Sequence, residues 1–250
     1  MSKKVAKAKK NQQAQSAPTA TLATKKTPWW WRYVLAPVLV LVLSFHLLIA
    51  LLLGVWRYVP VTNSMFMTLH RLEGKEVRQT WVDYDKIAKS TKQAAIVSED
   101  AKFVSHQGFD FDGMERAIKA NEKAGAVSMG GSTISQQLVK NLFLTSHRSY
   151  VRKAEEAIIT VMMETMWSKK RILEVYLNVV EFGEGIYGIE SASWHYYGKP
   201  AKSLSRAESA LLIGSLPRPK YYQKNRQNQR LRNKQRIILA RMDSAALPKE

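Results

Sequence analysis

The chain has 250 residues, of which 39 are Lys or Arg and 20 are Asp or Glu, so its formal net charge is +19, and it contains no Cys. The lack of Cys excludes disulfide bonds, cysteine nucleophiles and thiolate metal sites. The basic excess predicts an anionic partner, whether nucleic acid, a membrane surface or a phosphate-bearing ligand.

The N-terminal segment, residues 1–33, is rich in Lys, Ala, Gln, Ser and Thr up to residue 28, with few large apolar side chains before Trp29. This composition is typical of a disordered tail. All of the charged residues in the segment are basic. The positive-inside rule therefore predicts that this tail stays in the cytoplasm.

Residues 34–55 form an apolar run of 22 residues without a formal charge. As a helix, the run would rise about 33 Å, which is enough to cross a hydrocarbon core of ~30 Å. Aromatic side chains, which favour membrane interfaces, lie at both ends: Trp29, Trp30, Trp31, Tyr33, Trp56 and Tyr58. The length of the run and the lack of a small-residue cleavage site favour an uncleaved signal-anchor over a signal peptide. We expect His46, inside the run, to be a tolerated or helix-packing residue rather than a proton relay.

Residues 60–250 are then extracytoplasmic and are expected to form one domain. Nine of the 39 basic residues precede Pro60, which leaves 30 against all 20 acidic residues, so this domain is also basic. Its predicted location outside the cytoplasm argues against nucleic acid as the partner. The first part, residues 60–80, carries Met65, Phe66, Met67 and Leu69, which either belong to the core or dip into the membrane interface.

Helical patterns dominate the rest of the domain, and strand signals are weak. Gly125 and Gly183 are expected to end two of the helices, and Ser205 with Glu208 three residues later predicts a capping box at the start of another. The expected helical segments are 83–100, 113–125, 134–143, 152–167, 169–183 and 203–216. With residues 81–220 as its centre and a basic helix and tail in 221–250, the domain is predicted to be mostly α-helical.

The segment 96–114 concentrates four acidic residues and one His in a chain that is otherwise basic. One interpretation is an ordinary solvated loop. The other is a pocket in which a carboxylate acts as a base beside a bound anionic substrate.

A pair of glycines and two cap candidates, Ser132 and Thr133, precede the expected helix 134–143. Free backbone N–H groups and the positive end of the helix dipole at such a turn suit phosphate oxygens. One face of the helix is polar and comprises Thr133, Gln136, Gln137, Lys140 and Asn141. That face is either part of a phosphate site, to which Lys140 adds a full charge, or a solvated surface.

Three basic residues, Arg148, Arg152 and Lys153, gather around the start of the next helical pattern. Guanidinium forks match diphosphate geometry, although a basic run is also typical of a solvated surface. Glu155 and Glu156 follow within an otherwise apolar pattern, and a buried carboxylate is costly unless it is paired or functional. The helical periodicity leaves open which of the two glutamates matters.

The glycine pattern GEGIYG at 183–188 spells the dinucleotide-binding fingerprint. It follows a helical pattern rather than a strand, and no second strand with an acidic residue is evident. We therefore reject a dinucleotide site.

Five motifs together resemble the peptidoglycan glycosyltransferases of family 51. They are EDAKFVSHQGFD, GGSTISQQLVKN, RKAEE, KKRILEVYLNVVEFGEGIYGIESASWHYYGK and ALLIGSLPRP, and they follow the family's order and spacing from about residue 81 to residue 220. The chain has no S-x-x-K motif, so we expect no transpeptidase domain.

The resemblance implies a lysozyme-like helical domain with a small membrane-proximal jaw. It also implies a single-pass protein of the bacterial cytoplasmic (inner) membrane whose catalytic domain is periplasmic. The implied reaction is an inverting transfer of the growing lipid-linked glycan chain onto the 4-hydroxyl of lipid II, with release of polyprenyl diphosphate. By match to EDxxFxxHxG, Glu99 corresponds to the catalytic base. By match to R-K-x-x-E, Glu156 is the second functional carboxylate and assists at the diphosphate side.

The same resemblance assigns the remaining site positions. Asp100, Phe103 and His106 belong to the first motif and are implied to shape the substrate site and support it. The positions associated with the sugar-diphosphate of donor and acceptor are Ser132, Thr133, Gln136, Gln137, Lys140, Asn141, Arg148, Arg152 and Lys153. The jaw at 60–80 is too divergent to be mapped residue by residue.

No cofactor is implied as a requirement and no metal site is expected, with Mg²⁺ or Mn²⁺ acting at most as a stimulant. The implied partners are lipid II, the lipid-linked glycan strand, membrane lipid and other cell-wall synthesis proteins, without nucleic acid. Two other classes stay open: a lysozyme-like glycan hydrolase and a non-enzymatic membrane-anchored adaptor of the cell wall. A hydrolase would need neither the anchor nor the basic diphosphate cluster, and an adaptor would be indifferent to a change at Glu99.

Overall fold

The computed structural model describes residues 29–125, 130–147 and 149–249. The chain divides into two compact units, Met1–Ser44 and Phe45–Glu250, and each is described by itself. Two sequence-based expectations, the disordered tail at 1–28 and the substrate-binding role of Arg148, lie outside the described residues.

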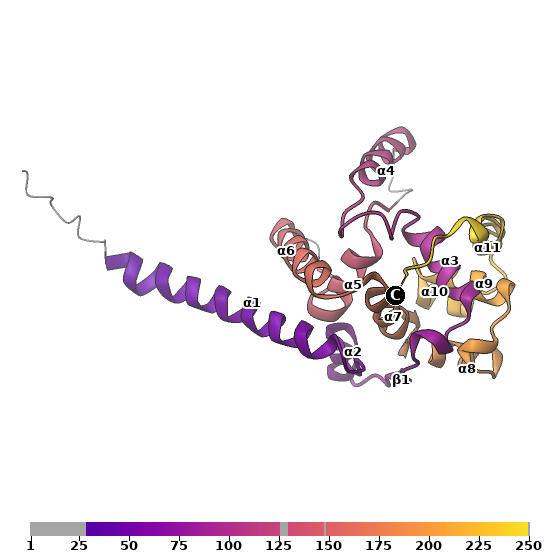
Figure 1. Ribbon diagram of the computed structural model, residues 1–250, viewed down its shortest axis with the longest axis horizontal. Helices are drawn as coiled ribbons and strands as arrows, with labels where there is room; N and C mark the ends of the chain where they lie inside the picture. Colours follow the sequence, from indigo (N-terminus) through magenta and orange to yellow (C-terminus); the bar gives the residue numbers. More distant parts are fainter. Residues whose placement is uncertain (1–28, 126–129, 148, 250) are drawn as a thin grey trace, which may run out of the picture. The chain divides into compact units, whose positions relative to one another are not determined.

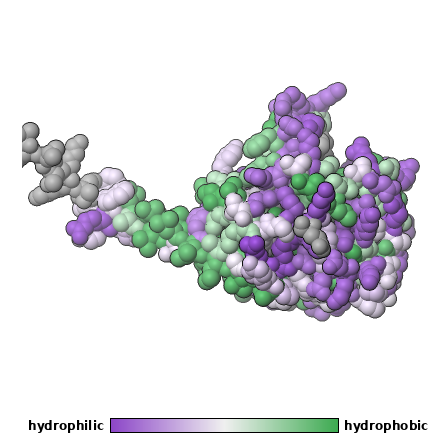
Figure 2. All heavy atoms as spheres, in the orientation of Figure 1, coloured by the Kyte–Doolittle hydropathy of each residue, from purple (hydrophilic) through white to green (hydrophobic). Residues whose placement is uncertain are grey.

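The described part of the first unit is a single helical segment. A π-helical stretch, Trp31–Leu35, continues into α1, Ala36–Trp56, whose second half belongs to the second unit. The helix Trp31–Trp56 has 26 residues and is long and apolar enough to cross a membrane. Most of its Leu and Val side chains are exposed, and Figure 2 shows the hydrophobic colouring along it, as expected for a surface that faces lipid.

The second unit consists mainly of helices, which confirms the expected mostly α-helical class. Three short 3-10 turns, at Tyr84–Lys86, Ala201–Ser203 and Met242–Ser244, join or follow them. The helices are α2 (Met65–Leu72), α3 (Lys89–Glu99), α4 (Phe111–Ala124), α5 (Ile134–Phe143), α6 (Tyr150–Met166), α7 (Lys169–Val179), α8 (Ile189–Tyr197), α9 (Arg206–Ser215), α10 (Pro219–Lys224) and α11 (Gln229–Arg241).

Local signals in the sequence explain several helix ends. Gly125 ends α4 in the left-handed region at φ +60°, where a glycine is unstrained. Ser205 and Glu208 form the expected capping box at the start of α9, with each side chain bonded to the other's backbone N–H. Both expectations are confirmed.

Two other expected helix bounds are wrong. The helix expected over 83–100 begins only at Lys89, because Tyr84–Lys86 forms a 3-10 turn and Ile87 is extended. The helix expected over 169–183 ends at Val179, because Val180 is extended and 181–183 is a strand. In both places tertiary pairing overrides a helical pattern.

Three short strands form one sheet in the order β1–β3–β2. β1 (Arg78–Gln79) pairs parallel with β3 (Ile186–Tyr187), and β2 (Glu181–Gly183) pairs antiparallel with β3. The pattern GEGIYG thus covers the β2–β3 turn, where Gly185 has φ +72° and an added Cβ would lie 2.2 Å from Glu76 O. These glycines serve a hairpin rather than a dinucleotide loop.

α7 lies at the centre of the second unit, with Ile172, Val175 and Tyr176 fully buried. α5 packs against α6 and α7, while α9 packs against α3 and α11, and Figure 1 shows α7 between these two groups. At the end of α7, the buried side chain of Asn178 bonds to Val82 N and O at 2.8 Å each. This core fixes the helices that carry the expected site residues.

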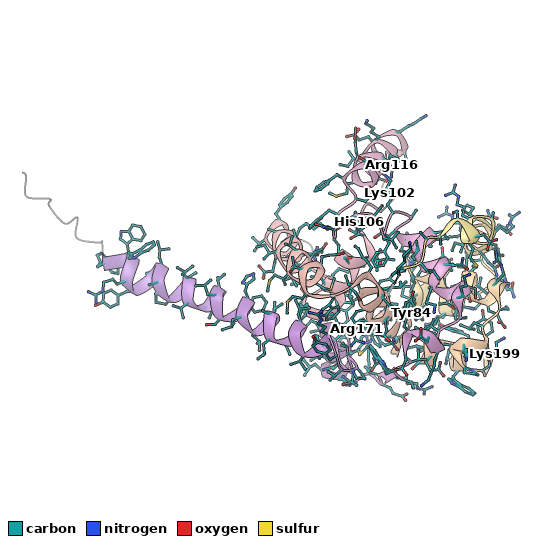
Figure 3. All side chains as sticks on the ribbon, in the orientation of Figure 1. Tyr84, Lys102, His106, Arg116, Arg171 and Lys199 are labelled. Carbon is teal, nitrogen blue, oxygen red and sulfur yellow. The ribbon has the colours of Figure 1, made fainter. Side chains whose placement is uncertain are left out.

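The C-terminal end of α1 is bonded to α7. The Arg171 guanidinium donates to Trp56 O at 2.7 and 3.0 Å and to Val59 O. These carbonyl groups lie at the end of the helix, where no further turn supplies N–H donors. Trp167 Nε1 donates to Leu53 O at 2.8 Å. Figure 3 labels Arg171 at this junction. Helix α1 therefore ends on a fixed point of the second unit.

The expected jaw segment joins this core only in part. Met67 on α2 is fully buried, whereas Leu72 at its end is 78% exposed. For Met67, the interpretation as a core residue is therefore correct. Leu72, in the same segment, is a large apolar side chain that is exposed on the surface.

His70 on α2 lies in a polar cluster that joins α2 to the hairpin and to α10. Its Nδ1 is 2.9 Å from Tyr187 OH and its Nε2 is 2.8 Å from Lys220 Nζ. Burial, with the charges of Lys220 and Lys75, lowers the pKa of His70, so its neutral ring accepts from Lys220. Burial raises the pKa of Glu181, 3.6 Å from Lys220, to about 6, although the lysine charge opposes this.

The raised pKa of Glu181 predicts that the stability of the fold depends on pH. Because the folded value of about 6 lies above the ordinary 4.5, folding disfavours the ionised form of Glu181, and the wild type loses stability as pH rises through that interval. The loss amounts to ~2 kcal/mol at most. Glu181→Gln removes this pH-dependent loss of stability, because the amide does not ionise. The melting temperature of the variant should therefore match that of the wild type near pH 4 and exceed it at pH 8.

The control for this prediction is Glu184→Gln, whose side chain is 49% exposed and pairs with Lys75. Its melting temperature should follow the wild type at both pH values. A Glu181→Gln effect of equal size at pH 4 and pH 8 would contradict the assignment, since it would not arise from ionisation.

Candidate active site

Glu99, the last residue of α3, is held by three side chains. Its Oε1 accepts from Ser98 Oγ at 2.7 Å and from Lys234 Nζ at 3.1 Å, while Oε2 accepts from Gln137 Nε2 at 3.3 Å. The Glu99 side chain is 11% exposed, and a carboxylate this buried is stable only with such partners. The shorter contacts are on Oε1, so Oε2 keeps more of its acceptor capacity.

Asp100 connects three parts of the site. Its carboxylate lies 2.8 and 3.0 Å from His106 Nε2 and accepts the backbone N–H of Ile134, the first residue of α5, at 3.0 Å. His106 Nδ1 accepts from Gly108 N at 3.1 Å, so the proton of the neutral ring is on Nε2 and is donated to Asp100. Asp100 therefore fixes both the tautomer of His106 and the start of α5.

Phe103 lies in the core. It is fully buried, with Lys169 Nζ 4.7 Å from its ring centroid and the His106 ring edge-on at 6.4 Å. Phe103 supports His106 from within the core. Gly108, at φ +89°, brings this loop against α6, because an added Cβ would lie 2.7 Å from Thr160 Cγ2.

The N-terminus of α5 is closed by its own caps. Thr133 Oγ1 accepts from Gln136 N at 3.2 Å, and Gln136 Oε1 accepts from Thr133 N at 3.1 Å, which completes a capping box. The N–H of Ile134 is taken by Asp100. The expectation of free N–H groups for phosphate is therefore wrong for these three residues, and Thr133 and Gln136, both buried, act in the cap.

The polar face of α5 that follows the cap supports Glu99. Tyr176 OH donates to Gln137 Oε1 at 3.1 Å, and burial raises the pKa of Tyr176, which keeps that proton in place. The Gln137 amide is thus oriented with Nε2 towards Glu99 and towards Ser132 O, at 3.4 Å. Asn141 Nδ2 bonds to Gln137 O at 2.8 Å, and Lys140 lies partly exposed beside it on the same helix.

The structure shows different surroundings for the two glutamates of α6, Glu155 and Glu156, between which helical periodicity could not decide. Glu156 is 3% exposed and pairs with Arg152 Nη1 at 2.7 Å and with Lys153 Nζ. Glu155 instead pairs with His46 of α1, at 3.1 Å between Oε1 and Nε2. Glu156 therefore lies among cations and Glu155 on the side of α1.

Lys234 and Tyr176 are site residues that the sequence did not indicate. Lys234 lies on α11, 135 residues after Glu99, in a helix whose composition resembles an ordinary basic surface. Only the packing of α11 against α3 and α9 brings it to Glu99. Tyr176 belongs to the buried face of α7, where an aromatic ring is expected in any core.

Within residues 29–125, 130–147 and 149–249, no group of three or more His, Cys, Asp or Glu side chains is placed to hold a metal ion. An apolar groove of about 270 Å³ runs between α1, the start of α2 and the end of α5, where Leu142 and Phe143 line it. Its lining reaches α5 two residues after Lys140.

Comparisons with known proteins show the family to which the chain belongs. The family model described as "Transglycosylase" matches residues 65–243. The chain is similar to proteins named biosynthetic peptidoglycan transglycosylase from Acinetobacter baylyi (49% identity, 87% of this chain, 99% of that protein) and Dechloromonas aromatica (46%, 88% and 97%). A protein of the same name from Nitrosomonas eutropha is 47% identical over 77% of this chain and 82% of its own length. The chain therefore belongs to the transglycosylase family, which confirms the resemblance seen in the five motifs.

The contact between Lys234 and Glu99 generates a prediction for glycosyl transfer. Lys234→Met removes the cation that donates to Glu99 Oε1 and leaves this largely buried carboxylate with two of its three partners. The rate at neutral pH should fall roughly tenfold or more, as expected for the loss of a charge-assisted contact. Lys234→Arg keeps the charge and should restore most of the rate.

The matched control is Lys202→Met, an exposed lysine in the turn before α9, which should leave the rate unchanged. A wild-type rate in Lys234→Met would show that Lys234 does not act on Glu99.

Proposed function

We propose that this protein polymerises the glycan strands of peptidoglycan, transferring the growing lipid-linked chain onto the 4-hydroxyl of lipid II with release of polyprenyl diphosphate. The observation that carries the proposal is the buried carboxylate of Glu99, held on one oxygen by Ser98 and Lys234 while the other keeps acceptor capacity. The shared name of the relatives supports peptidoglycan as the product.

Glu99 is the general base in this mechanism. Its Oε2 takes the proton of the 4-hydroxyl as that oxygen attacks the anomeric carbon of the growing chain. The bond from that carbon to the diphosphate oxygen breaks, its electron pair stays on the diphosphate, and the configuration inverts. A positioned base of this kind contributes roughly 10²–10⁴-fold to the rate.

The cations of α5 and α6 bind the leaving diphosphate. Lys140, Arg152 and Lys153, with Arg148 by resemblance, stabilise the negative charge that develops on it. Glu156 is buried against Arg152 and Lys153, so its function is to hold these side chains rather than to donate a proton. Ser132 and Asn141 complete the polar surroundings of the sugar-diphosphate by resemblance.

The apolar elements suit a substrate with a polyprenyl chain. Phe143, which lines the groove between α1, α2 and α5, follows Lys140 by three residues and therefore lies on the adjoining surface of α5, so a diphosphate at Lys140 would have its lipid chain near this groove. The helix Trp31–Trp56 keeps the protein in the inner membrane, with the N-terminus in the cytoplasm and the catalytic domain in the periplasm.

The mechanism requires no cofactor. Protein cations already balance the diphosphate, so we propose that Mg²⁺ or Mn²⁺ acts only as a stimulant and that chelation lowers the rate without abolishing it. Other cell-wall synthesis proteins are the proposed partners besides the lipid substrates and membrane lipid.

Incubating the full-length protein with lipid II and resolving the products by size tests the function. Glycan polymers that carry a lipid end are the expected result. Cleavage of finished glycan strands without polymerisation would favour a lysozyme-like hydrolase, and the absence of both activities would favour an adaptor.

Glu99→Gln tests the assignment of the base. The amide keeps the size and hydrogen bonding of the side chain but does not accept the proton, so polymerisation should fall ~10²-fold or more. Melting temperature and lipid II binding should be retained. Glu115→Gln, an exposed α4 glutamate that pairs with Lys119, is the control and should be fully active. Near-normal turnover of Glu99→Gln would refute the assignment.

Lys140 is the cation whose role at the diphosphate is most directly testable. If it contacts a phosphate, Lys140→Ala should weaken binding of phosphoglycolipid inhibitors that mimic the lipid diphosphate, by roughly tenfold to over a hundredfold. Lys140→Arg keeps the charge and should recover part of the affinity. A solvated helix face predicts changes within about 0.5 kcal/mol for both variants. Unchanged inhibitor affinity in Lys140→Ala would remove Lys140 from the site.

A further inference from the structure

The outer half of α1 packs onto the second unit through one face. Ile49 and Leu53 are 2% and 0% exposed, whereas Leu47 and Leu51 are 72% and 63% exposed. With His46, the two buried residues follow the three-and-four spacing of one helix face. This part of the apolar helix is therefore an element of the folded domain as well as a membrane anchor.

His46 and Glu155 form the polar contact on this face. His46 Nε2 lies 3.1 Å from Glu155 Oε1, and the two side chains are 19% and 24% exposed. His46 precedes Trp56 by ten residues, so it lies about 15 Å along the helix from the aromatic residue that marks the outer interface. A polar or ionisable side chain at such a depth is costly unless a polar group lies against it. Each of the two residues therefore stabilises the other in this position.

Few buried side chains fix the first half of α6. The buried residues of α6 begin only at Glu156 and continue with Ile159, Thr160 and Met163, while Tyr150 and Val151 are 97% and 81% exposed. The contact of Glu155 with His46 holds this half against α1 from the side. Because Glu155 and Glu156 are consecutive, that contact also limits how the helix turn with Glu156 rotates.

We infer that His46 is a positioning residue for the diphosphate site. The His46–Glu155 pair sets the orientation of the first turns of α6, and through Glu156 it sets where Arg152 and Lys153 present their charges. The anchor helix thus contributes to substrate binding and does more than tether the protein. This inference rests on the proposed function for the binding of a diphosphate by these cations.

The test uses the full-length protein in vesicles of phosphatidylethanolamine and phosphatidylglycerol. The variants are His46→Leu, Glu155→Leu, the double variant with both changes, and the exchanged pair His46→Glu with Glu155→His. Leu47→Ala, an exposed apolar position of the same helix, is the matched control.

Three quantities are measured: the inhibition constant of a polyprenyl diphosphate, KM for lipid II, and kcat for lipid II per folded molecule. A change that only destabilises the protein lowers the number of active molecules and leaves the inhibition constant unchanged. A change that displaces Arg152 and Lys153 weakens binding of the diphosphate in molecules that remain folded.

We expect His46→Leu and Glu155→Leu each to raise the inhibition constant about tenfold, as for the loss of one polar contact. The double variant should be no worse than either single variant, and the exchanged pair should lie within about threefold of the wild type. Leu47→Ala should match the wild type.

An unchanged inhibition constant in His46→Leu would overturn the inference, as would effects of the two single variants that multiply in the double variant. These outcomes are distinct from failure of the proposed function, in which the wild type itself makes no polymer or does not bind the polyprenyl diphosphate.

Discussion

The burial of carboxylates in a strongly basic chain is the constraint on which the site depends. Glu99, Asp100 and Glu156 are all largely removed from water, and an unpaired charge in such a position is costly. Glu99 and Asp100 are therefore bonded to donors from other parts of the fold: Lys234 for Glu99, and His106 with the start of α5 for Asp100. Glu156 is bonded to Arg152 and Lys153 of its own helix. The excess of basic residues supplies the partners that make these burials stable.

The same pairings connect the helices that form the site. Glu99 connects α3 with α5 and α11, and Asp100 connects the loop after α3 with the N-terminus of α5. Glu155 connects α6 with His46 of α1. A carboxylate that is positioned from several helices keeps its orientation when substrate binds, which is what a general base and a diphosphate site require. The site is thus a property of the whole second unit, including the end of its anchor helix.

The sequence predicted those features that depend on neighbouring residues. The apolar helix, the stop at Gly125 and the capping box at Ser205 follow from local spacing and appear as expected. Features that depend on tertiary contacts were missed or misjudged. The N–H group of Ile134 at the start of α5 looked free because its partner, Asp100, is 34 residues away in the chain. Lys234 looked like surface charge for the same reason. Periodicity could not separate Glu155 from Glu156, because the contact of Glu155 with α1 joins residues that are far apart in the chain.

A structure of the full-length protein with a bound lipid-linked disaccharide diphosphate tests the central claim most directly. The account predicts phosphate oxygens about 3 Å from the side-chain nitrogens of Lys140, Arg152 and Lys153. It also predicts the anomeric carbon between these cations and Glu99, with space at Glu99 Oε2 for an acceptor hydroxyl. A diphosphate bound away from α5 and α6, or a Glu99 carboxylate closed off from the sugar, would contradict the account.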